Sequence, residues 1–248
     1  SEMCIRDRYI LIIGSIVALV FLAVAGNEKR AAAGLTRQNW KSAVLIVLAF
    51  VGIYIVRTVV SVAVQGVSDG SGMQYVKEWA AMFKNPMMWL NIAALPINYF
   101  FVFIAFFGEE YGWRYYLQPV LQKRFGLRAG VIILGIVWGL WHIPDDLFYY
   151  TQTSGIQMIF AQQITCISLG IFFAYAYMKT QNIWVPVCLH YLNNNLIPII
   201  SGTFSADVLE NQTVSWKDLP VALVLNGLCF GFFLLADVFK KKEVQEEE

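Results

Sequence analysis

Few side chains in this sequence suit catalysis, and those that do lie within or directly after apolar segments. The stretch GEEYGWRYY places Glu109, Glu110 and Arg114 directly after the apolar run NYFFVFIAFF. The chain has 2 histidines, His142 and His190, and both follow largely apolar residues. Carboxylates and imidazoles are the groups that enzymes most often use to transfer protons. These residues are therefore candidates for general acid–base chemistry in an apolar environment.

The composition of the chain is that of a membrane protein. Hydrophobic residues make up 58% of the 248 residues, charged residues make up 14%, and the mean hydropathy is +0.57. Soluble domains carry about 25% charged residues. The formal net charge is +1 and the sequence shows no strongly basic face, so we do not expect nucleic acid as a partner.

Apolar segments recur along the chain at lengths near the roughly 20 residues that a bilayer-spanning helix needs. They predict an all-α, polytopic transmembrane helical bundle of about seven spans. The expected spans are 9–25, 43–64, 88–107 continuing toward 120, 130–150, 156–178, 184–203 and 219–239. No linker separates them, so we expect a single domain over residues 9–240, followed by a charged tail at 241–248.

Basic residues gather in alternate loops. The segments 26–41 and 121–129, the turn at Lys179 and the tail are basic, whereas the intervening loops are neutral or acidic. The positive-inside rule then places the basic loops and the C-terminus in the cytoplasm. We expect a protein integral to a prokaryotic cell membrane.

Seven spans would leave the two arginines of the N-terminal sequence MCIRDR on the outer side. When Met3–Arg8 is translated back into possible codons, one choice resembles the transposon end used in sequencing libraries. We therefore hypothesise that residues 1–8 are not native and that an upstream helix is missing, which would give eight spans. The alternative is a short charged terminus that stays outside.

Three ionisable residues are expected at a similar depth below the cytoplasmic surface. Counting about 1.5 Å of helix per residue from the nearest basic cluster, Glu110 lies about 20 Å deep, His142 about 21 Å and His190 about 17 Å. An uncompensated charge at such a position costs at least about 2.5–3.5 kcal/mol, so buried ionisable groups face one another or water. The sequence thus predicts a shared polar cavity between three helices.

Helical spacing separates the two glutamates. Glu110 and Arg114 are four residues apart and can form an ion pair on one face, whereas Glu109 points about 100° away. Glu109 is therefore the carboxylate that we expect to face the cavity.

The same spacing recurs around the histidines. Trp138 lies four residues before His142, and Asn194 lies four residues after His190, so each pair shares a helix face. Any one pair is explained as well by an ordinary hydrogen bond or packing contact between helices. Together, on successive helices, the pairs favour a functional site.

The three motifs EEYGWR, WGLWH and HYLNN resemble the EExxxR, aromatic-xxx-His and HxxxN motifs of the CPBP family. These intramembrane peptidases, also called the Abi family, include CAAX prenyl proteases and bacteriocin-processing or immunity proteins. The motifs cover residues 109–194, and they appear in the order of that family. Trp138 stands where the second motif most often has phenylalanine, a change that keeps an aromatic side chain.

The resemblance implies an intramembrane endopeptidase in which an activated water attacks a peptide bond. Glu109 would be the base, His142 would orient and help to deprotonate the water, and His190 and Asn194 would donate hydrogen bonds to the oxyanion.

Three further residues would support the catalytic ones. Glu110 and Arg114 would pair with each other, and Trp138 would form an aromatic wall. The substrate would be a peptide or protein associated with the membrane lipid, such as a prenylated or leader-bearing one.

The family has been described both as metal-free and as metal-dependent. If zinc binds, its ligands would be Glu109, His142 and His190, whose donor types suit it. The HExxH motif of soluble zinc peptidases is absent, and Asn194 is a poor zinc ligand but a good hydrogen-bond donor. We therefore expect no cofactor.

Two other functions compete with proteolysis. Buried Glu, His and Arg residues also form proton relays in transporters, but no inverted repeat is visible in the sequence. A non-catalytic immunity or scaffold protein of the same fold is the second alternative, because intact motifs do not by themselves establish turnover.

Overall fold

The computed structural model describes residues 20, 24, 26–32, 34–69, 72–201 and 210–240, and these residues form helices and short connections without a strand. The expected span 9–25 falls almost entirely outside them, as do the expected non-native segment 1–8 and the tail 241–248. The chain forms two compact units, residues 1–112 with 182–211 and residues 113–181 with 212–248.

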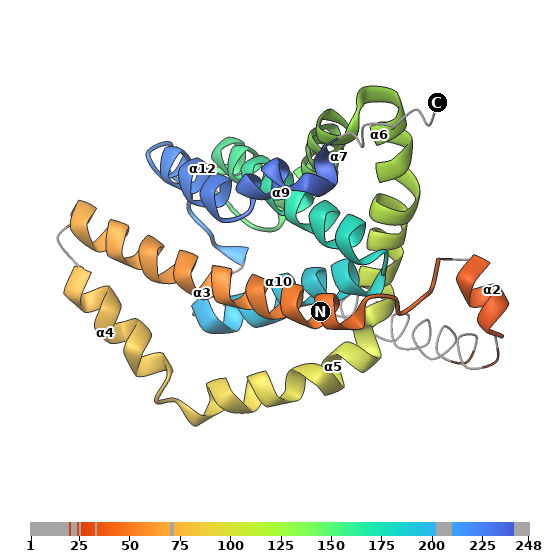
Figure 1. Cartoon of the computed structure of the whole chain (residues 1–248). Helices are drawn as coiled ribbons and strands as arrows, with labels where there is room; N and C mark the ends of the chain where they lie inside the picture. Colours follow the sequence, from red (N-terminus) through yellow and green to blue (C-terminus); the bar gives the residue numbers. More distant parts are fainter. Residues whose placement is uncertain are drawn as a thin grey trace. The chain divides into compact units, whose positions relative to one another are not determined.

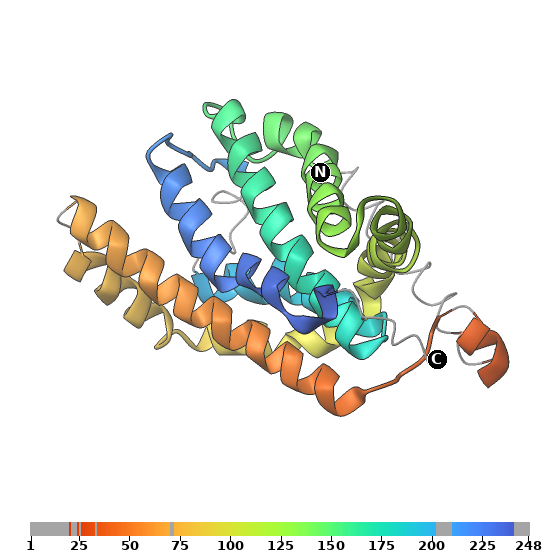
Figure 2. The ribbon, with the colours of Figure 1, turned by 45° about the horizontal axis from the view of Figure 1, so that its top comes forward.

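Unit 1 has two long helices, α3 and α5, with α10 packed against both of them. Figures 1 and 2 show α3, in orange, beside the light-blue α10. A further helix, α4, packs against α3. The helices of this unit are α2 (Asn27–Ala32), α3 (Trp40–Asp69), α4 (Gly72–Met82), α5 (Pro86–Glu110) and α10 (Trp184–Ser201).

Local sequence and apolar packing explain how α5 and α10 are held together. Asn85 caps α5 by accepting a hydrogen bond from the Met87 amide at 3.0 Å, and proline occupies the first helical position. Tyr191 of α10 is buried in a cluster with residues of both helices, and its hydroxyl donates to the Leu95 carbonyl at 2.7 Å. The register of α10 against α5 is thus fixed by both apolar and polar contacts.

Unit 2 is arranged around α9, which contacts α7, α8 and α12. Figure 2 shows the blue α12 running alongside the teal α9. Unit 2 begins within the π-helix η1, which as a whole covers Tyr111–Leu117. Its other elements are α6 (Gln118–Phe125), α7 (Leu127–Trp141), α8 (Ile143–Phe148), α9 (Gly155–Thr180), α12 (Asp218–Cys229) and the 3-10 helices η2 (Gly231–Leu235) and η3 (Asp237–Phe239).

Two glycines allow α7 and α9 to approach closely. A Cβ atom added at Gly135 would lie 2.6 Å from the Ile167 Cα atom, and one added at Gly170 would lie 3.4 Å from the Gly135 Cα atom. Small residues at such positions are typical of membrane helix pairs, because they increase the packing area between backbones.

We expect Gly135→Val to destabilise unit 2 by about 1–3 kcal/mol or more, because its side chain would collide with backbone atoms that cannot rotate away. Thermal unfolding in detergent, followed by tryptophan fluorescence, measures this loss. Gly112→Val is the control, since no atom lies within 4 Å of a Cβ added at Gly112. Equal melting temperatures for the two variants would contradict the prediction.

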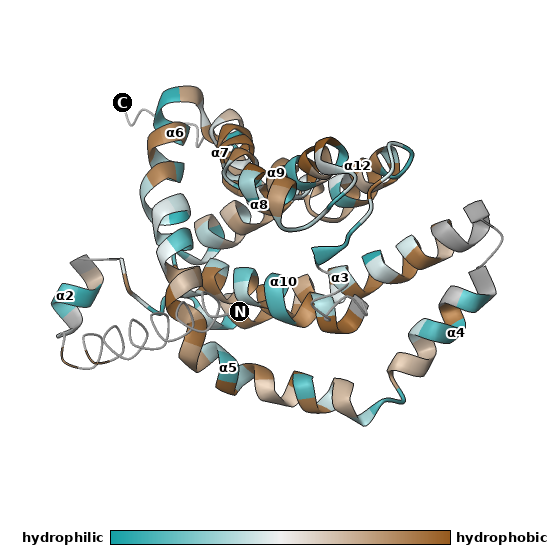
Figure 3. Cartoon of the chain, turned by 180° about the vertical axis from the view of Figure 1, so that it is seen from behind, coloured by the Kyte–Doolittle hydropathy of each residue, from teal (hydrophilic) through white to brown (hydrophobic). Residues whose placement is uncertain are grey.

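Four helices among the described residues are long and apolar enough to cross a membrane: Trp40–Val64, Pro86–Phe125, Leu127–Phe148 and Gly155–Thr180. Their outward faces carry large exposed hydrophobic side chains, including Leu45, Leu48 and Ile97. Figure 3 shows hydrophobic residues, in brown, over much of α7. The predicted polytopic transmembrane helical bundle is thus confirmed.

The number of long spans differs from the seven expected. The segment 184–203 is helical at Trp184–Ser201, but His190 and three asparagines lower its hydropathy, and it is not among the four. The expected span 219–239 is wrong as a continuous helix. It forms the 12-residue α12 and then the two 3-10 helices η2 and η3.

Candidate active site

The two glutamates lie where α5 changes into a π-helix. Glu110 is the last residue of α5 and is completely buried, whereas Glu109 is half-buried. The next seven residues form η1. π-helical turns are rare and frequent at functional sites, because they alter the directions of side chains within an otherwise regular helix.

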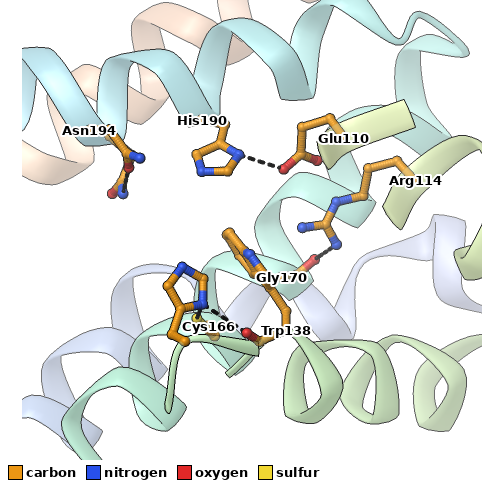
Figure 4. Close-up of polar contacts among 9 residues, drawn as sticks. Glu110, Arg114, Trp138, Cys166, Gly170, His190 and Asn194 are labelled. Atoms are coloured by element: carbon orange, nitrogen blue, oxygen red, sulfur yellow. Dashed lines mark hydrogen bonds and ion pairs between the residues drawn. The ribbon is translucent and has the colours of Figure 1, made fainter. Parts of the chain in front are cut away.

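Glu110 forms a buried pair with His190 of α10. Its Oε1 atom lies 2.9 Å from His190 Nδ1, and the two side chains are 0% and 3% exposed (Figure 4). An ionised carboxylate only accepts hydrogen bonds, so Nδ1 carries the proton and donates it. The pair places these two residues at the same depth, as the sequence predicted, although the contact itself was not foreseen.

Glu109 has a different environment in the same unit. Its Oε2 atom is buried and has no hydrogen-bond partner among the described residues. A buried carboxylate oxygen without a partner costs free energy, so it requires an explanation such as bound water or catalysis. This oxygen can therefore accept a proton from a water molecule.

Asn194 lies one turn beyond His190 on α10. Its side chain is exposed, and its Oδ1 atom accepts a hydrogen bond from the side-chain Nδ2 group of Asn193 at 2.8 Å. Asn193 and Asn195, which flank Asn194, also carry amide groups that can donate hydrogen bonds. In the structure Asn195 is half-buried and donates to the Tyr191 carbonyl.

His142 joins α7 to α8 in unit 2. Its backbone angles, φ −85° and ψ −5°, lie near the sparsely populated bridge region where many active-site residues occur. Its Nδ1 atom lies 2.8 Å from the Trp138 carbonyl oxygen, which can only accept, so Nδ1 is the donor and Nε2 of a neutral ring has a lone pair. The two rings are in edge contact with centroids 5.9 Å apart, as their spacing predicted. The Cys166 Sγ atom lies 3.8 Å from the same nitrogen.

Arg114 is completely buried in unit 2. Its Nη1 atom donates to the Gly170 carbonyl at 3.3 Å, and its guanidinium lies 5.3 Å from the ring centre of Trp138 and 5.4 Å from that of Phe173 (Figure 4). These contacts stabilise the cation through the ring faces and a carbonyl dipole. The expected ion pair with Glu110 stays a prediction, because the two residues belong to different units.

The structure thus divides the expected site residues between the units. Unit 1 holds Glu109, Glu110, His190 and Asn194, and unit 2 holds Arg114, Trp138 and His142. Within the part of the chain that the structure describes, no three His, Cys, Asp or Glu side chains form a metal-binding group. A zinc site built from Glu109, His142 and His190 stays a matter for experiment.

Asp146 was not among the residues that the sequence singled out. It is completely buried in α8, and neither carboxylate oxygen has a partner among the described residues. Burial raises the pKa of the Tyr150 hydroxyl to about 12, with smaller contributions from charges that include Asp145 and Asp146. The only sequence signal for Asp146 was its position four residues after His142.

The fold and these residues define a helical membrane protein in which the acid–base side chains of Glu110 and His190 are buried against each other. Residues 90–196 match the family described as "Type II CAAX prenyl endopeptidase Rce1-like". The match includes all three motifs and confirms the resemblance to the CPBP family of intramembrane peptidases.

The chain is also similar to a protein of Methanococcus maripaludis named CAAX prenyl protease 2, with 28% identity over 125 residues. The aligned region covers 47% of this chain and 45% of that protein, so the chain matches just under half of its relative. No solved structure matches the chain.

Proposed function

We propose that this protein is a CAAX-type intramembrane endopeptidase that hydrolyses a peptide bond of a membrane-anchored protein or peptide. The observation that carries the proposal is the buried carboxylate oxygen of Glu109, which has no hydrogen-bond partner within the described part of the chain and is next in sequence to the buried Glu110–His190 pair. Both lie within the region that matches the CAAX endopeptidase family. A purely structural pair of glutamates would not require one oxygen to be buried without a partner.

In the proposed reaction Glu109 accepts a proton from water, and the water oxygen attacks the carbonyl carbon of the scissile bond. The electron pair of the C=O bond moves onto oxygen and forms the oxyanion of a tetrahedral intermediate. When the intermediate collapses, the C–N bond breaks, and the leaving nitrogen takes the proton from Glu109. The products are a carboxylic acid and an amine, and transfer of the acid proton to the amine gives a carboxylate and an ammonium group. His142, whose Nδ1 donates to the Trp138 carbonyl, would use Nε2 to orient the water.

His190 and Asn194 would stabilise the oxyanion. The Glu110 carboxylate accepts from Nδ1 of His190 and holds the ring, so that an N–H group at Nε2 would serve as a donor to the oxyanion. The Asn194 amide would supply a second, neutral donor. Glu110 is in this proposal a positioning residue that acts through His190.

The location of these residues on the helices of a membrane protein suits a substrate that is already in the bilayer. A prenyl chain attached near the C-terminus of a substrate would hold its last residues at the membrane, and the name of the relative and the description of the family both refer to CAAX prenyl processing. We propose that the basic loops and the C-terminus of this chain lie on the cytoplasmic side of a prokaryotic cell membrane, and that substrates enter from that side.

The proposal is tested with purified protein in liposomes and a panel of synthetic peptides analysed by mass spectrometry. The panel contains a farnesylated CAAX peptide, its unprenylated counterpart and a leader peptide. We expect cleavage after the prenylated cysteine. Cleavage of the leader peptide alone would keep the peptidase but overturn the CAAX specificity, and no cleavage of any peptide would contradict the proposed function.

Activity is expected to survive the removal of metal ions. In the proposed reaction Glu109 supplies the base and two donors stabilise the oxyanion, so no step needs a Lewis acid. Dialysis against EDTA and 1,10-phenanthroline, with the zinc content measured by mass spectrometry, checks this expectation. Loss of activity in chelator, with recovery on adding stoichiometric zinc, would show that the reaction is metal-dependent.

A further inference from the structure

Asn194 is connected to α3 by two consecutive hydrogen bonds. The Tyr54 hydroxyl donates to Oδ1 of Asn193, and the Nδ2 group of Asn193 donates to Oδ1 of Asn194 at 2.8 Å. All three residues belong to unit 1, so α3 and α10 hold this connection within one compact body. Tyr54 is 139 residues away from Asn193 in sequence, and the motifs do not indicate it.

The direction of these two bonds determines how Asn194 presents its amide. Tyr54 supplies a proton, so the carbonyl oxygen of Asn193 faces α3 and its NH2 group faces Asn194. The oxygen of Asn194 is then occupied as an acceptor. No hydrogen bond to another described residue engages its Nδ2 group, and the side chain is exposed. Asn194 therefore presents N–H donors, as an oxyanion requires.

Tyr54 is itself held firmly. Its side chain is 5% exposed, its ring packs edge-on against Phe50 with centroids 5.0 Å apart, and the Arg57 guanidinium lies 5.8 Å from the ring centre. A hydroxyl on such a constrained ring can fix the amide that it contacts. A separate bond between Asn98 and Asn195 links α5 to α10 and does not involve Asn194.

We propose that Tyr54 is a positioning residue for the oxyanion donor, acting through Asn193 to orient the amide of Asn194. This inference rests on the proposed peptidase function. Without the Tyr54 hydroxyl the two asparagine amides can rotate, and the oxygen of Asn194 can turn toward the developing negative charge. Pre-orientation of donors is what makes an oxyanion site effective, because no reorganisation is then needed during the reaction.

The test is a double-mutant cycle on cleavage of the farnesylated peptide. We expect Tyr54→Phe to lower kcat about tenfold with an unchanged KM, because the amide acts only once the oxyanion forms. In an Asn194→Ala background the same substitution should change kcat less than twofold, since its effect passes through Asn194. A role of Tyr54 in packing alone would lower activity by the same factor in both backgrounds.

Two further variants keep the test decisive. Thr58→Val is the matched control: it removes a buried hydroxyl one turn further along α3 that makes no hydrogen bond to the asparagines in the described part of the chain, and it should leave kcat unchanged. Asn193→Asp keeps the acceptor for Tyr54 but removes the donor to Asn194, so it should reproduce the tenfold loss even if Tyr54→Phe folds poorly.

The outcomes separate this inference from the function on which it rests. If Asn194→Ala is slow while Tyr54→Phe and Asn193→Asp are as fast as the wild type, the positioning role is overturned and the peptidase proposal stands. If Glu109→Gln and Asn194→Ala both cleave at the wild-type rate, the proposed site is wrong, and the role proposed for Tyr54 is wrong as well.

Discussion

Replacing Glu109 by glutamine is expected to lower kcat for peptide cleavage by roughly 10³-fold, within the range that general-base catalysis contributes. Glutamine has nearly the same shape but cannot accept a proton from water at neutral pH. Because Glu109 Oε2 has no hydrogen-bond partner among the described residues, the substitution breaks no contact of that oxygen. Its melting temperature should therefore stay close to that of the wild type, and the loss should appear in kcat rather than in the amount of folded protein.

Glu78→Gln is a suitable control for this experiment, because Glu78 is an exposed carboxylate on α4 that accepts a hydrogen bond from Gln74. A Glu109→Gln variant that retains wild-type cleavage would contradict the assignment of Glu109 as the base. The same variant also distinguishes the competing functions. A scaffold or immunity protein would keep its cellular phenotype, whereas a transporter would show solute flux in liposomes that does not follow cleavage.

The second large effect is expected at Glu110 and concerns stability as well as activity. Glu110→Ala should lower the free energy of unfolding by about 1–3 kcal/mol, the usual cost of leaving a buried hydrogen-bonding group without its partner. His190 would remain 3% exposed with its Nδ1 donor deprived of the carboxylate. Activity should fall as well, because His190 would lose the acceptor that orients it. Thermal unfolding in detergent and the peptide assay measure the two effects.

Glu110→Gln separates the hydrogen bond from the charge. Its amide oxygen can still accept from His190 Nδ1, so we expect most of the stability to return while activity stays low, since a hydrogen bond to a neutral amide is weaker than one to a carboxylate and orients the ring less firmly. The double variant Glu110→Ala/His190→Ala should be less unstable than the sum of the single variants, because their side chains interact directly. Strict additivity would mean that the observed pair does not stabilise the fold.

The sequence predicted the helical class and the membrane environment well, because both depend on composition and on the length of apolar segments. It failed at the C-terminal segment 219–239. Hydropathy cannot distinguish a continuous span from the short α12 followed by two 3-10 helices, since all three elements are apolar. Similarly, placing His190 and its neighbouring asparagines in lipid costs free energy unless these side chains have hydrogen-bond partners. Sequence alone does not identify those partners.

At the candidate site, sequence indicated which residue types matter but not which of them touch. Counting residues from the basic loops placed Glu110 and His190 at one depth, and the structure shows them in contact. The count could not decide which of the two adjacent glutamates meets the imidazole, because that depends on the rotation of α5 relative to α10. The π-helix that starts at Tyr111 adds a further uncertainty, since its altered turn changes the directions assumed from regular helical spacing.

Tyr54 illustrates the limit of motif-based prediction most clearly. It lies outside every motif, 139 residues from its hydrogen-bond partner, and only tertiary packing of α3 against α10 brings the two together. Asp146 was underestimated for a related reason. Two adjacent aspartates after a proline are typical of a surface turn, but Asp146 is completely buried in α8.

The proposed hydrolysis is tested most directly by isotope labelling. Purified protein in liposomes is incubated with the farnesylated CAAX peptide in water enriched in oxygen-18, and the products are analysed by mass spectrometry. We expect a shortened peptide with one oxygen-18 atom in its new carboxylate from the wild type, and almost none from Glu109→Gln. Absence of a labelled product, or equal amounts from both proteins, would show that this chain does not use Glu109 to activate water for peptide hydrolysis.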